Sequence, residues 1–201
     1  MSTETRPTTK AAQREATRAK LLAAARDLFG ERGYAGVGTE EVVRAAGVTR
    51  GALYHQFADK RELFEAVLIE LEQQVLTVAA QRMAEHPDDV LAAFKAGCQG
   101  WLEASADPAT GRILLTDGPA VLGLDGWRAV AEEHGLGVVK ASLAHGMETG
   151  AIKRRPIDPL AHVIVGALDE AALYVARAED RPAALAEMTE IVDRMVDAFA
   201  A

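Results

Sequence analysis

The chain has a single cysteine, Cys98, among its 201 residues, and only 5% of the residues are aromatic. One cysteine excludes an intramolecular disulfide and a cysteine-rich zinc site. No apolar run approaches the roughly 20 residues that a membrane-spanning helix needs. The polar residues 1–9 also lack the apolar core of a signal peptide. We therefore expect a cytoplasmic protein that has no membrane partner.

Catalytic and metal-binding patterns are missing as well. The sequence contains no His-x-x-x-His pair and no recognisable Ser-His-Asp arrangement. His134 and His145 would share one face of a helix but stand three turns apart, roughly 16 Å, which is too far for one metal ion. We expect no metal site, no cofactor and no enzymatic activity.

The composition favours helices over strands. Hydrophobic residues make up 49% of the chain, alanine is abundant, and no stretch alternates β-branched with polar residues. A helical pattern begins at about Lys10, and Gly30 and Gly33 should end it. Further helices are predicted over 39–46, 50–56, 59–85, 88–104, 125–150, 158–175 and from 182, with Asp88, Asp125 and Asp158 as N-caps, a bend at Gly135 and Gly137, and an irregular segment at 116–119.

Charge is distributed unevenly along the chain. Residues 1–64 carry 11 Lys and Arg against 8 Asp and Glu, a net charge of +3, whereas the remainder carries 11 against 22, a net charge of −11. Such an asymmetry favours a polyanionic partner that is held at one end and repelled from the rest. Ordinary variation of surface charge is the alternative.

Residues 39–57 have the spacing of a helix-turn-helix. Two short helices must cross at a turn of three to four residues that contains glycine, so that the second helix can project into a DNA major groove. Gly47 supplies the permissive backbone. Leu53 and Phe57 are four residues apart and share the face that packs inward. Arg50 and Tyr54 share another face, which is left free to touch DNA.

This part of the chain is similar to the DNA-binding domain of the TetR (tetracycline repressor) family. The resemblance runs from about Thr17 to Ala66, and three blocks carry it: LFGERGY at 28–34, RAAGVTRGALYHQF at 44–57 and DKRELF at 59–64. A helix-turn-helix pattern alone is weakly specific, whereas three blocks in order and at the right spacing are strongly so. The resemblance implies a DNA-binding regulator.

The resemblance also implies roles for individual residues. Arg50 would read a base, because a guanidinium can bond bidentately to a guanine edge, and Gly51 would let the helix approach the groove closely. Tyr54, His55 and Lys60 would contact phosphates. The full set of implied DNA-binding residues is Thr39, Thr49, Arg50, Gly51, Ala52, Tyr54, His55 and Lys60.

Several of these residues also have a purely structural interpretation. Tyr54 could be a packed aromatic residue, Arg50 a solvated charge and Thr49 only a helix cap. Thr39 could cap its helix, contact a phosphate, or do both. Tyr34, by contrast, is expected to brace the turn after the first helix.

The remainder of the chain resembles the helical regulatory domains attached to such DNA readers, which form dimers through their last two helices. The run 163–175 is apolar on more than one face, and the final helix carries a second apolar stripe, so a monomer would expose both. Burial within one subunit is the alternative. Asp169 and Glu170 interrupt the run, and we expect them to pair with arginines such as Arg177 or Arg194, or to lie near a pocket.

A small-molecule pocket is also predicted in this part. Its candidate lining residues are Phe94, Cys98, Trp101, Trp127, Met147 and Tyr174, although such a stripe is more often core. Cys98 could sense redox state, but a buried thiol is usually inert.

The sequence thus predicts an all-α protein: a flexible arm at 1–9, a three-helix helix-turn-helix DNA-binding domain at 10–64, and a helical ligand-binding and dimerisation domain at 65–201. The expected function is that of a one-component repressor, which binds a pseudo-palindromic operator as a homodimer and is released by an unidentified small-molecule effector. The rivals are a helical enzyme or carrier with a degenerate DNA-binding domain, and a protein-interaction module.

Overall fold

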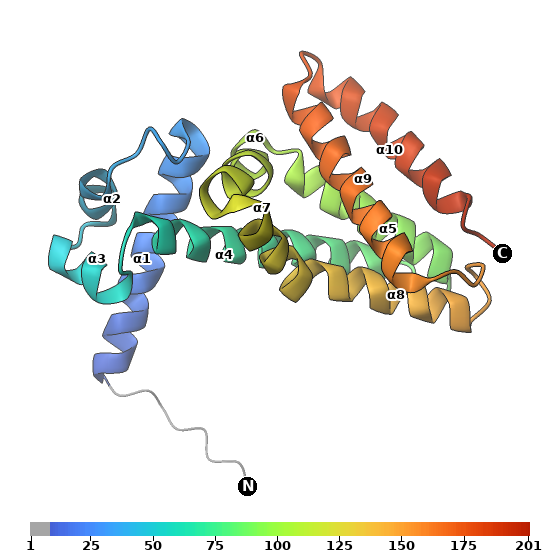
Figure 1. Ribbon diagram of the computed structural model, residues 1–201, viewed down its shortest axis with the longest axis horizontal. Helices are drawn as coiled ribbons and strands as arrows, with labels where there is room; N and C mark the ends of the chain where they lie inside the picture. Colours follow the sequence, from blue (N-terminus) through green and yellow to red (C-terminus); the bar gives the residue numbers. More distant parts are fainter. Residues whose placement is uncertain (1–8) are drawn as a thin grey trace, which may run out of the picture. The chain divides into compact units, whose positions relative to one another are not determined.

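The computed structural model describes residues 9–201, and these residues fold into helices joined by short connections (Figure 1). Between residues 9 and 201 there is no strand, only an isolated bridge between Ile152 and Ala200. The all-α fold class is therefore confirmed. The helices are α1 (Thr9–Arg32), α2 (Thr39–Ala46), α3 (Arg50–Gln56), α4 (Lys60–Ala84), α5 (Val90–Ser105), α6 (Pro108–Gly111), α7 (Gly118–Ala131), α8 (Gly137–Glu148), α9 (Ile157–Arg177) and α10 (Arg181–Asp197), with π-helical segments η1 (Arg112–Asp117) and η2 (Glu132–Leu136).

The chain divides into two compact units, which meet inside α4. Unit 1 ends at Leu68 and unit 2 runs from Ile69 to Ala201. The predicted domain boundary, between residues 64 and 65, lies four residues before this division. Of the arm predicted at 1–9, residues 1–8 lie outside the described part of the chain, and Thr9 is the first residue of α1.

Unit 1 is built around the apolar stripe of α1. Leu21, Ala25 and Phe29 recur every four residues, so they share one face, and all three are fully buried. The ring of Phe29 lies 5.7 Å from that of Tyr34 and 5.5 Å from that of Phe64, and the last two rings are 5.1 Å apart. This aromatic cluster holds the end of α1, the following turn and the start of α4 together. Tyr34 thus has the bracing position expected of it.

Glycine ends α1 later than predicted. Gly33 has φ 75°, a left-handed conformation that glycine adopts without steric cost. Its N–H donates to the Phe29 carbonyl at 2.8 Å and closes the last turn. The prediction that Gly30 also ends the helix is wrong, because the helix continues through it to Arg32.

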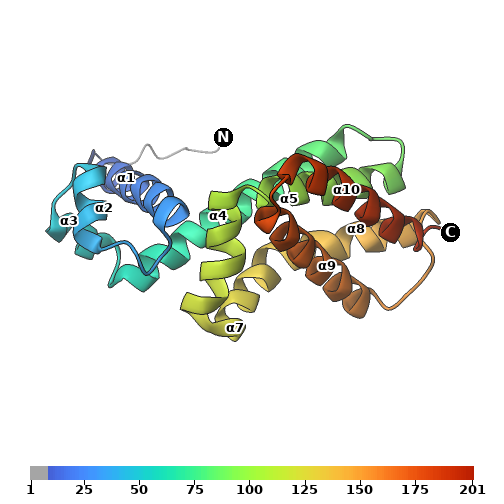
Figure 2. The same ribbon diagram turned by 90° about the horizontal axis from the view of Figure 1, so that it is seen from above.

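Unit 2 is a stack of helices around α9, which contacts α5, α6, α8 and α10. Figure 2 shows α9 and α10 side by side. Polar contacts fasten α10 to α5: Lys95 Nζ lies 2.5 Å from Asp197 Oδ1, and Gln99 Nε2 donates to Asp193 Oδ1 at 2.7 Å. By length and composition α9 could cross a membrane. In the protein it packs against α5, α6, α8 and α10, and 39% of its most apolar stretch is buried.

Glycines let α4 and α5 approach closely. A Cβ at Gly97 would come within 2.7 Å of Met83 Cγ, and one at Gly100 would come within 2.8 Å of Arg82 Cγ. Arg82 in turn forms an ion pair with Glu103, at 2.7 Å. Helices α4 and α5 are therefore in contact where Gly97 faces Met83 and Gly100 faces Arg82.

Several predicted helix starts in unit 2 are wrong by one or a few residues. Asp89, not Asp88, caps α5, and its Oδ1 accepts the Ala92 N–H at 2.9 Å. Pro156, not Asp158, precedes α9, while Asp158 forms an ion pair with Lys140 at 2.6 Å. Asp125 lies two residues after a break at Gly123, where the second helical part of α7 begins, so the helix start predicted at Asp125 is only slightly late.

The connection between α6 and α8 is more regular than predicted. Residues 116–119 are not irregular but belong to η1 and α7. A sharp break occurs instead at Gly123, whose φ of 75° interrupts α7. The bend expected at Gly135 and Gly137 takes the form of η2, which ends where α8 begins. Such π-helical turns are frequent at functional sites.

The start of α2 is organised by Glu41. Gly38 is the N-cap and Thr39 is the first helical residue, so of the two roles left open for Thr39 the structure excludes the cap. The Gly38 N–H donates to Glu41 Oε2 at 2.9 Å, and Arg32 Nη1 donates to Glu41 Oε1 at 2.7 Å. The Arg32 guanidinium, with the Gly38 N–H, lowers the pKa of Glu41 to about 2.

Glu41→Gln is predicted to destabilise the protein in a pH-dependent way. A folded-state pKa of about 2, against 4.5 for a free glutamate, means that the carboxylate stabilises the fold fully above pH 4.5 and loses this effect as the pH falls toward 2. Urea unfolding should therefore show a lower free energy of unfolding for the variant at pH 7 and a vanishing difference near pH 2.

Glu40→Gln is the matched control on the same helical turn, because the ion pair of Glu40 with Arg50 is two-thirds exposed and such pairs contribute little. A Glu41→Gln difference that stayed constant from pH 7 to pH 2 would contradict the assigned role of the carboxylate.

Candidate nucleic-acid interface and cavity

The turn between α2 and α3 has helix-turn-helix geometry. Gly47 adopts φ 64°, and its N–H donates to the Arg44 carbonyl at 3.2 Å. Thr49 is the N-cap of α3, where its Oγ1 accepts the Ala52 N–H at 3.2 Å. Because glycine alone takes the left-handed conformation at little cost, Gly47 permits the tight crossing that the sequence predicted.

One side of α3 is anchored in unit 1. Leu53 is fully buried and Phe57, just beyond the helix, is 1% exposed. The Arg18 guanidinium of α1 lies 4.7 Å from the centre of the Phe57 ring. Gln56 Nε2 donates to the Arg14 carbonyl, also on α1, at 2.9 Å. These contacts fix both the position and the rotation of α3.

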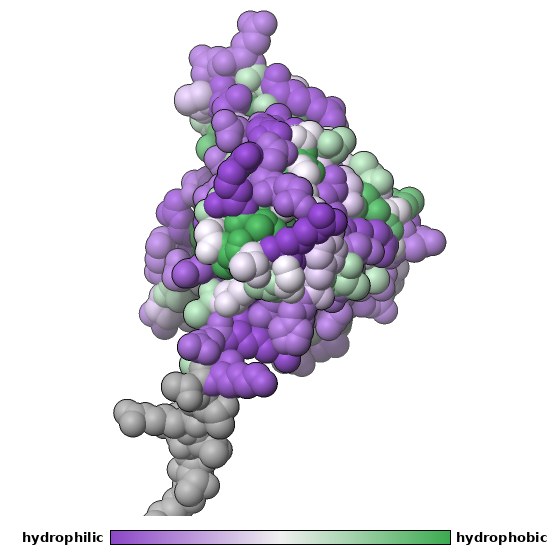
Figure 3. Space-filling model, turned by 90° about the vertical axis from the view of Figure 1, so that its left-hand side faces the viewer, coloured by the Kyte–Doolittle hydropathy of each residue, from purple (hydrophilic) through white to green (hydrophobic). Residues whose placement is uncertain are grey.

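The opposite side of α3 is open to solvent. Arg50, Gly51, Tyr54 and His55 are exposed, and Tyr54 retains 44% of its surface. Figure 3 looks onto the side where α2 and α3 lie, and hydrophilic residues dominate it. The predicted reading residues are thus brought together on one surface, whereas Thr49 and Ala52 lie at the start of the helix.

Gly51 has no packing role in the protein. A Cβ at this position would meet nothing closer than Thr49 Oγ1, at 3.9 Å. The residue also lies inside a helix, where glycine costs up to about 1 kcal/mol relative to alanine. The fold therefore supplies no reason for a glycine here.

Glu40 is a participant that sequence reasoning did not identify. Its Oε1 lies 3.0 Å from Arg50 Nη1, and the Arg50 guanidinium lies 5.5 Å from the centre of the Tyr54 ring. The crossing of the helices places Glu40 beside α3, where it pairs with Arg50.

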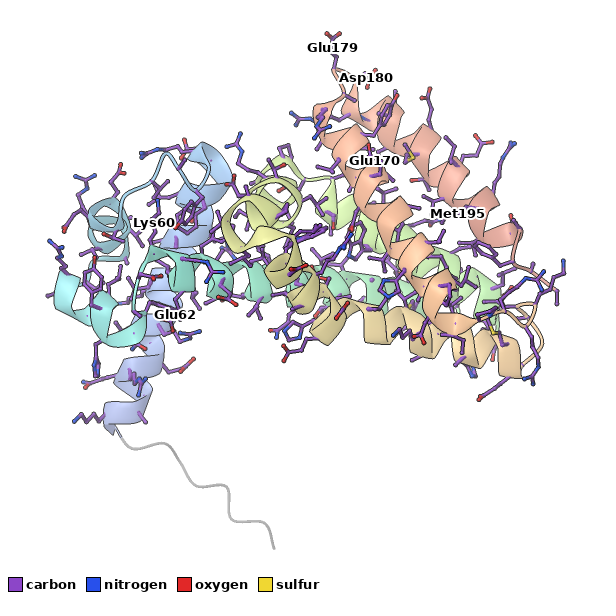
Figure 4. The ribbon with its side chains drawn as sticks, in the orientation of Figure 1. Lys60, Glu62, Glu170, Glu179, Asp180 and Met195 are labelled. Atoms are coloured by element: carbon purple, nitrogen blue, oxygen red, sulfur yellow. The ribbon has the colours of Figure 1, made fainter. Side chains whose placement is uncertain are left out.

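Lys60 stabilises the fold in addition to its predicted role at the DNA-binding surface (Figure 4). Its Nζ donates to the Tyr34 carbonyl at 2.9 Å and to the Val37 carbonyl at 3.0 Å. The same ammonium lies 3.9 Å from the centre of the Tyr34 ring. An ammonium has three N–H donors, so one remains for an external anion. This structural role was not predicted.

Unit 2 contains a cavity of about 80 Å³, several times the roughly 10–15 Å³ that one water molecule needs. Of the predicted lining residues, Phe94, Cys98, Trp101 and Trp127 line it. Its wall also includes Glu72, Leu76, Ala79, Met83, Gly97, Leu114, Leu115, Ala131, Gly135, Leu136, Val138, Val139, Ser142, Val165, Leu168 and Asp169.

Two predicted lining residues lie elsewhere. Tyr174 is on an outer face of α9 and is 53% exposed, and Met147 is buried near the end of α8. Neither belongs to the cavity wall. Their placement in the pocket is wrong, because helical spacing does not reveal which neighbour covers a given face.

Trp127 closes a gap in the hydrogen bonding of η1. The Gly118 N–H donates to the Ile113 carbonyl, and Pro119 has no N–H to offer the Leu114 carbonyl. The Trp127 indole Nε1 donates to that carbonyl at 2.8 Å. One wall of the cavity is therefore fixed by a side chain of α7.

Two acidic residues face this otherwise apolar cavity. The prediction that Asp169 pairs with an arginine is wrong, and its alternative, a position near a pocket, is what the structure has. Burial raises the pKa of Asp169 to about 7, and burial together with the Asp169 charge raises the pKa of Glu72 to about 7. Glu170 is exposed, and Arg194 pairs with Glu190 instead.

Cys98 has no features of a reactive thiol. It is 6% exposed, and burial, with a smaller contribution from Asp193, raises its pKa to about 12. Only the thiolate is strongly nucleophilic, so Cys98 contributes to the cavity wall as an apolar side chain.

Two family descriptions match the chain. Residues 21–67 match "Bacterial regulatory proteins, tetR family", and residues 91–199, more than half of the chain, match "Tetracyclin repressor-like, C-terminal domain". The chain belongs to the TetR family. The resemblance seen in the three N-terminal sequence blocks is thereby confirmed.

Two named transcriptional regulators match less than half of the chain each. The transcriptional regulator AcrR of Shigella flexneri is 32% identical over 99 residues, which is 49% of this chain and 46% of AcrR. CymR of Pseudomonas putida is 40% identical over 82 residues, 40% of each chain. The chain thus spans less than half the length of these two relatives.

Solved TetR-family structures match over nearly the whole chain. A regulator from Pectobacterium atrosepticum is 31% identical, has a TM-score of 0.74, and is covered to 98% by 96% of this chain. RolR, solved in complex with resorcinol, is 25% identical with a TM-score of 0.68, over 92% of this chain and 95% of its own.

Trp127→Phe is predicted to lower the free energy of unfolding by about 1–3 kcal/mol, the usual cost of leaving a buried acceptor unpaired. Leu114 is 2% exposed, so water cannot readily replace the indole. Urea unfolding measures the difference. Trp101→Phe is the matched control, since the Trp101 indole has no hydrogen-bond partner among residues 9–201; equal losses in the two variants would contradict the role of the Trp127 bond.

Proposed function

We propose that this TetR-family protein is a one-component transcriptional repressor of the cytoplasm, which binds a pseudo-palindromic operator as a homodimer and leaves it when a small molecule occupies unit 2. One observation carries the proposal. A seven-residue helix, α3, is fastened on one side by Leu53, Gln56 and Phe57 and presents Arg50, Gly51, Tyr54 and His55 on the other.

The contacts proposed with DNA follow from side-chain chemistry. Arg50 leaves Glu40 and bonds to a base edge in the major groove. Tyr54 and His55 bind phosphates, and Lys60 adds its remaining donor. Gly51 brings the backbone of α3 close to the groove, which explains a glycine that the fold itself does not need.

Thr39, Thr49 and Ala52 complete the proposed interface. Thr39 and Thr49 stand at the starts of α2 and α3, where a hydroxyl group can donate a hydrogen bond to a phosphate. Ala52 adds an apolar contact surface beside Gly51. These assignments rest on the family resemblance together with the position of each residue.

The proposed dimer uses α9 and α10. Val163 and Tyr174 of α9 are 60% and 53% exposed, and Ile191 of α10 is 59% exposed. Val163 and Tyr174 are eleven residues apart, three full turns, so they share one face. Figure 4 labels Glu170 on α9 and Met195 on α10, the two helices that carry this apolar face. A second copy of the chain would cover it.

The cavity of unit 2 is proposed as the effector site. RolR was solved with resorcinol, and a mostly apolar wall with two tryptophans suits a small aromatic ligand. An effector that binds more tightly to the form unable to span two successive major grooves would lower DNA affinity by its differential affinity.

Selection of genomic fragments by the protein should return one shared palindrome with half-sites about one helical turn apart. Binding to that fragment should weaken steeply with salt, since each phosphate neutralised releases a counterion. Fluorescence anisotropy at several salt concentrations measures this. Weak binding without a shared sequence would refute the proposal and favour a carrier or enzyme with a degenerate DNA-binding domain.

Gly51→Ala and Tyr54→Ala test the interface directly. Each should weaken operator binding about tenfold or more, a loss of roughly 1.4 kcal/mol. Melting temperatures should be almost unchanged for Tyr54→Ala and equal or higher for Gly51→Ala, because alanine is the better helix former. Retained operator affinity in Gly51→Ala would show that the backbone does not approach DNA there.

Val163→Lys should shift the protein from dimer to monomer, because a charge in the proposed apolar contact would be left unpaired. Sedimentation velocity gives the association state, and circular dichroism should show unchanged helix content. Leu124→Lys is the matched control: Leu124 is a 51% exposed leucine on α7, outside the proposed contact. Loss of the dimer in both variants, or in neither, would contradict the assignment to α9.

A further inference from the structure

The cavity of unit 2 holds two carboxyl groups that the protein itself does not use. Glu72 comes from α4 and Asp169 from α9, and both line the wall. Within residues 9–201, neither forms a hydrogen bond or an ion pair. A carboxyl group in an apolar setting costs folding free energy unless it is paired, so the fold alone gives no reason for them.

The wall carries no positive charge to balance these groups. None of the described residues that line the cavity is Lys, Arg or His. The negative charges are also placed close enough to interact, because the charge of Asp169 raises the pKa of Glu72. A positive charge inside the cavity would relieve both the burial and the mutual repulsion.

Gly135 of η2 keeps space for the Glu72 carboxyl group. A Cβ at Gly135 would lie 2.9 Å from Glu72 Oε1, which is too close for two such atoms. Two residues further on, a Cβ at Gly137 would meet nothing within 4 Å. A side chain at the first of these glycines would therefore displace the carboxyl group, whereas one at the second would not.

Aromatic rings form another part of the wall. Trp101 and Phe94 come from α5, and Trp127 from α7. The Trp127 N–H is already bonded to the Leu114 carbonyl, so this indole offers the cavity a π surface rather than a donor. Tryptophan faces attract organic cations more strongly than the faces of tyrosine or phenylalanine do.

We infer that the cavity binds an organic cation, an amine or a quaternary ammonium carried on an apolar body. Glu72 and Asp169 neutralise its charge, and Trp101, Trp127 and the aliphatic wall cover the rest. As an identification of the effector class, this rests on the proposed function. As a statement about binding, it rests on the cavity alone.

Isothermal titration calorimetry of the full chain without DNA tests the inference. The probes are benzyltrimethylammonium and hexyltrimethylammonium, with benzyl alcohol and hexanol as uncharged counterparts. Each cation should bind at least about tenfold more tightly than its alcohol, the usual gain from a charge-assisted contact.

Matched variants assign the effect to these residues. Glu72→Gln and Asp169→Asn should each weaken cation binding about tenfold or more and leave alcohol binding unchanged. Glu170→Gln, which alters the exposed neighbour of Asp169 (Figure 4), should change neither. Gly135→Ala should weaken cation binding by displacing the Glu72 carboxyl group, whereas Gly137→Ala should not.

The pH dependence supplies a separate readout. The titratable groups on the cavity wall are Glu72 from α4, Cys98 from α5 and Asp169 from α9. Cys98 stays protonated because its pKa is about 12, and both carboxyl groups have pKa values of about 7. The affinity for a quaternary ammonium, whose own charge does not titrate, should rise several-fold from pH 6 to pH 8.

Equal or tighter binding of the alcohols, or failure of both cations to bind, would overturn the inference without affecting the proposed DNA binding. So would cation binding that is unchanged in Glu72→Gln and Asp169→Asn. If the cations bind as expected but leave operator affinity unchanged, the cation site stands and the effector role in the proposed function fails.

Discussion

The packing of Leu53 and Phe57 into unit 1 is the contact on which the proposed DNA-reading surface depends. An isolated helix shorter than about 12–15 residues is marginal in water, and α3 has seven residues. Its shape therefore comes from burial rather than from its own hydrogen bonds. Because one side is committed to the core, the other side is presented in a single orientation, which is what recognition of a groove requires.

Polar contacts also hold unit 1 rigid, without adding side chains to its core. Glu41 joins the N-terminus of α2 to Arg32 at the end of α1, and Lys60 ties the start of α4 to the carbonyls of Tyr34 and Val37. The loop between α1 and α2 is thus held from both ends. The Lys60 ammonium therefore stabilises the fold with two of its three N–H donors.

Unit 2 differs from unit 1 because its cavity and the two acidic residues in the cavity wall lower the stability of the fold. An apolar wall would be more stable without Glu72 and Asp169, and a filled core would be more stable than a cavity. The π-helical segments η1 and η2 both contribute residues to this wall. A cavity whose residues lower the stability of the fold, while the surrounding helices are well packed, is typical of a binding site.

The sequence by itself determined the all-α class, the bounds of α2 and α3, the turn at Gly47 and the cap at Thr49, because helical periodicity and local backbone chemistry act over a few residues. It also identified Phe94, Trp101 and Trp127 as candidates for the pocket. Only the tertiary structure decided that Tyr174 and Met147 lie outside it, that Asp169 meets Glu72, and that Glu40 holds Arg50. Each of these outcomes depends on residues far apart in the chain, whose contacts follow from how whole helices pack rather than from any local pattern.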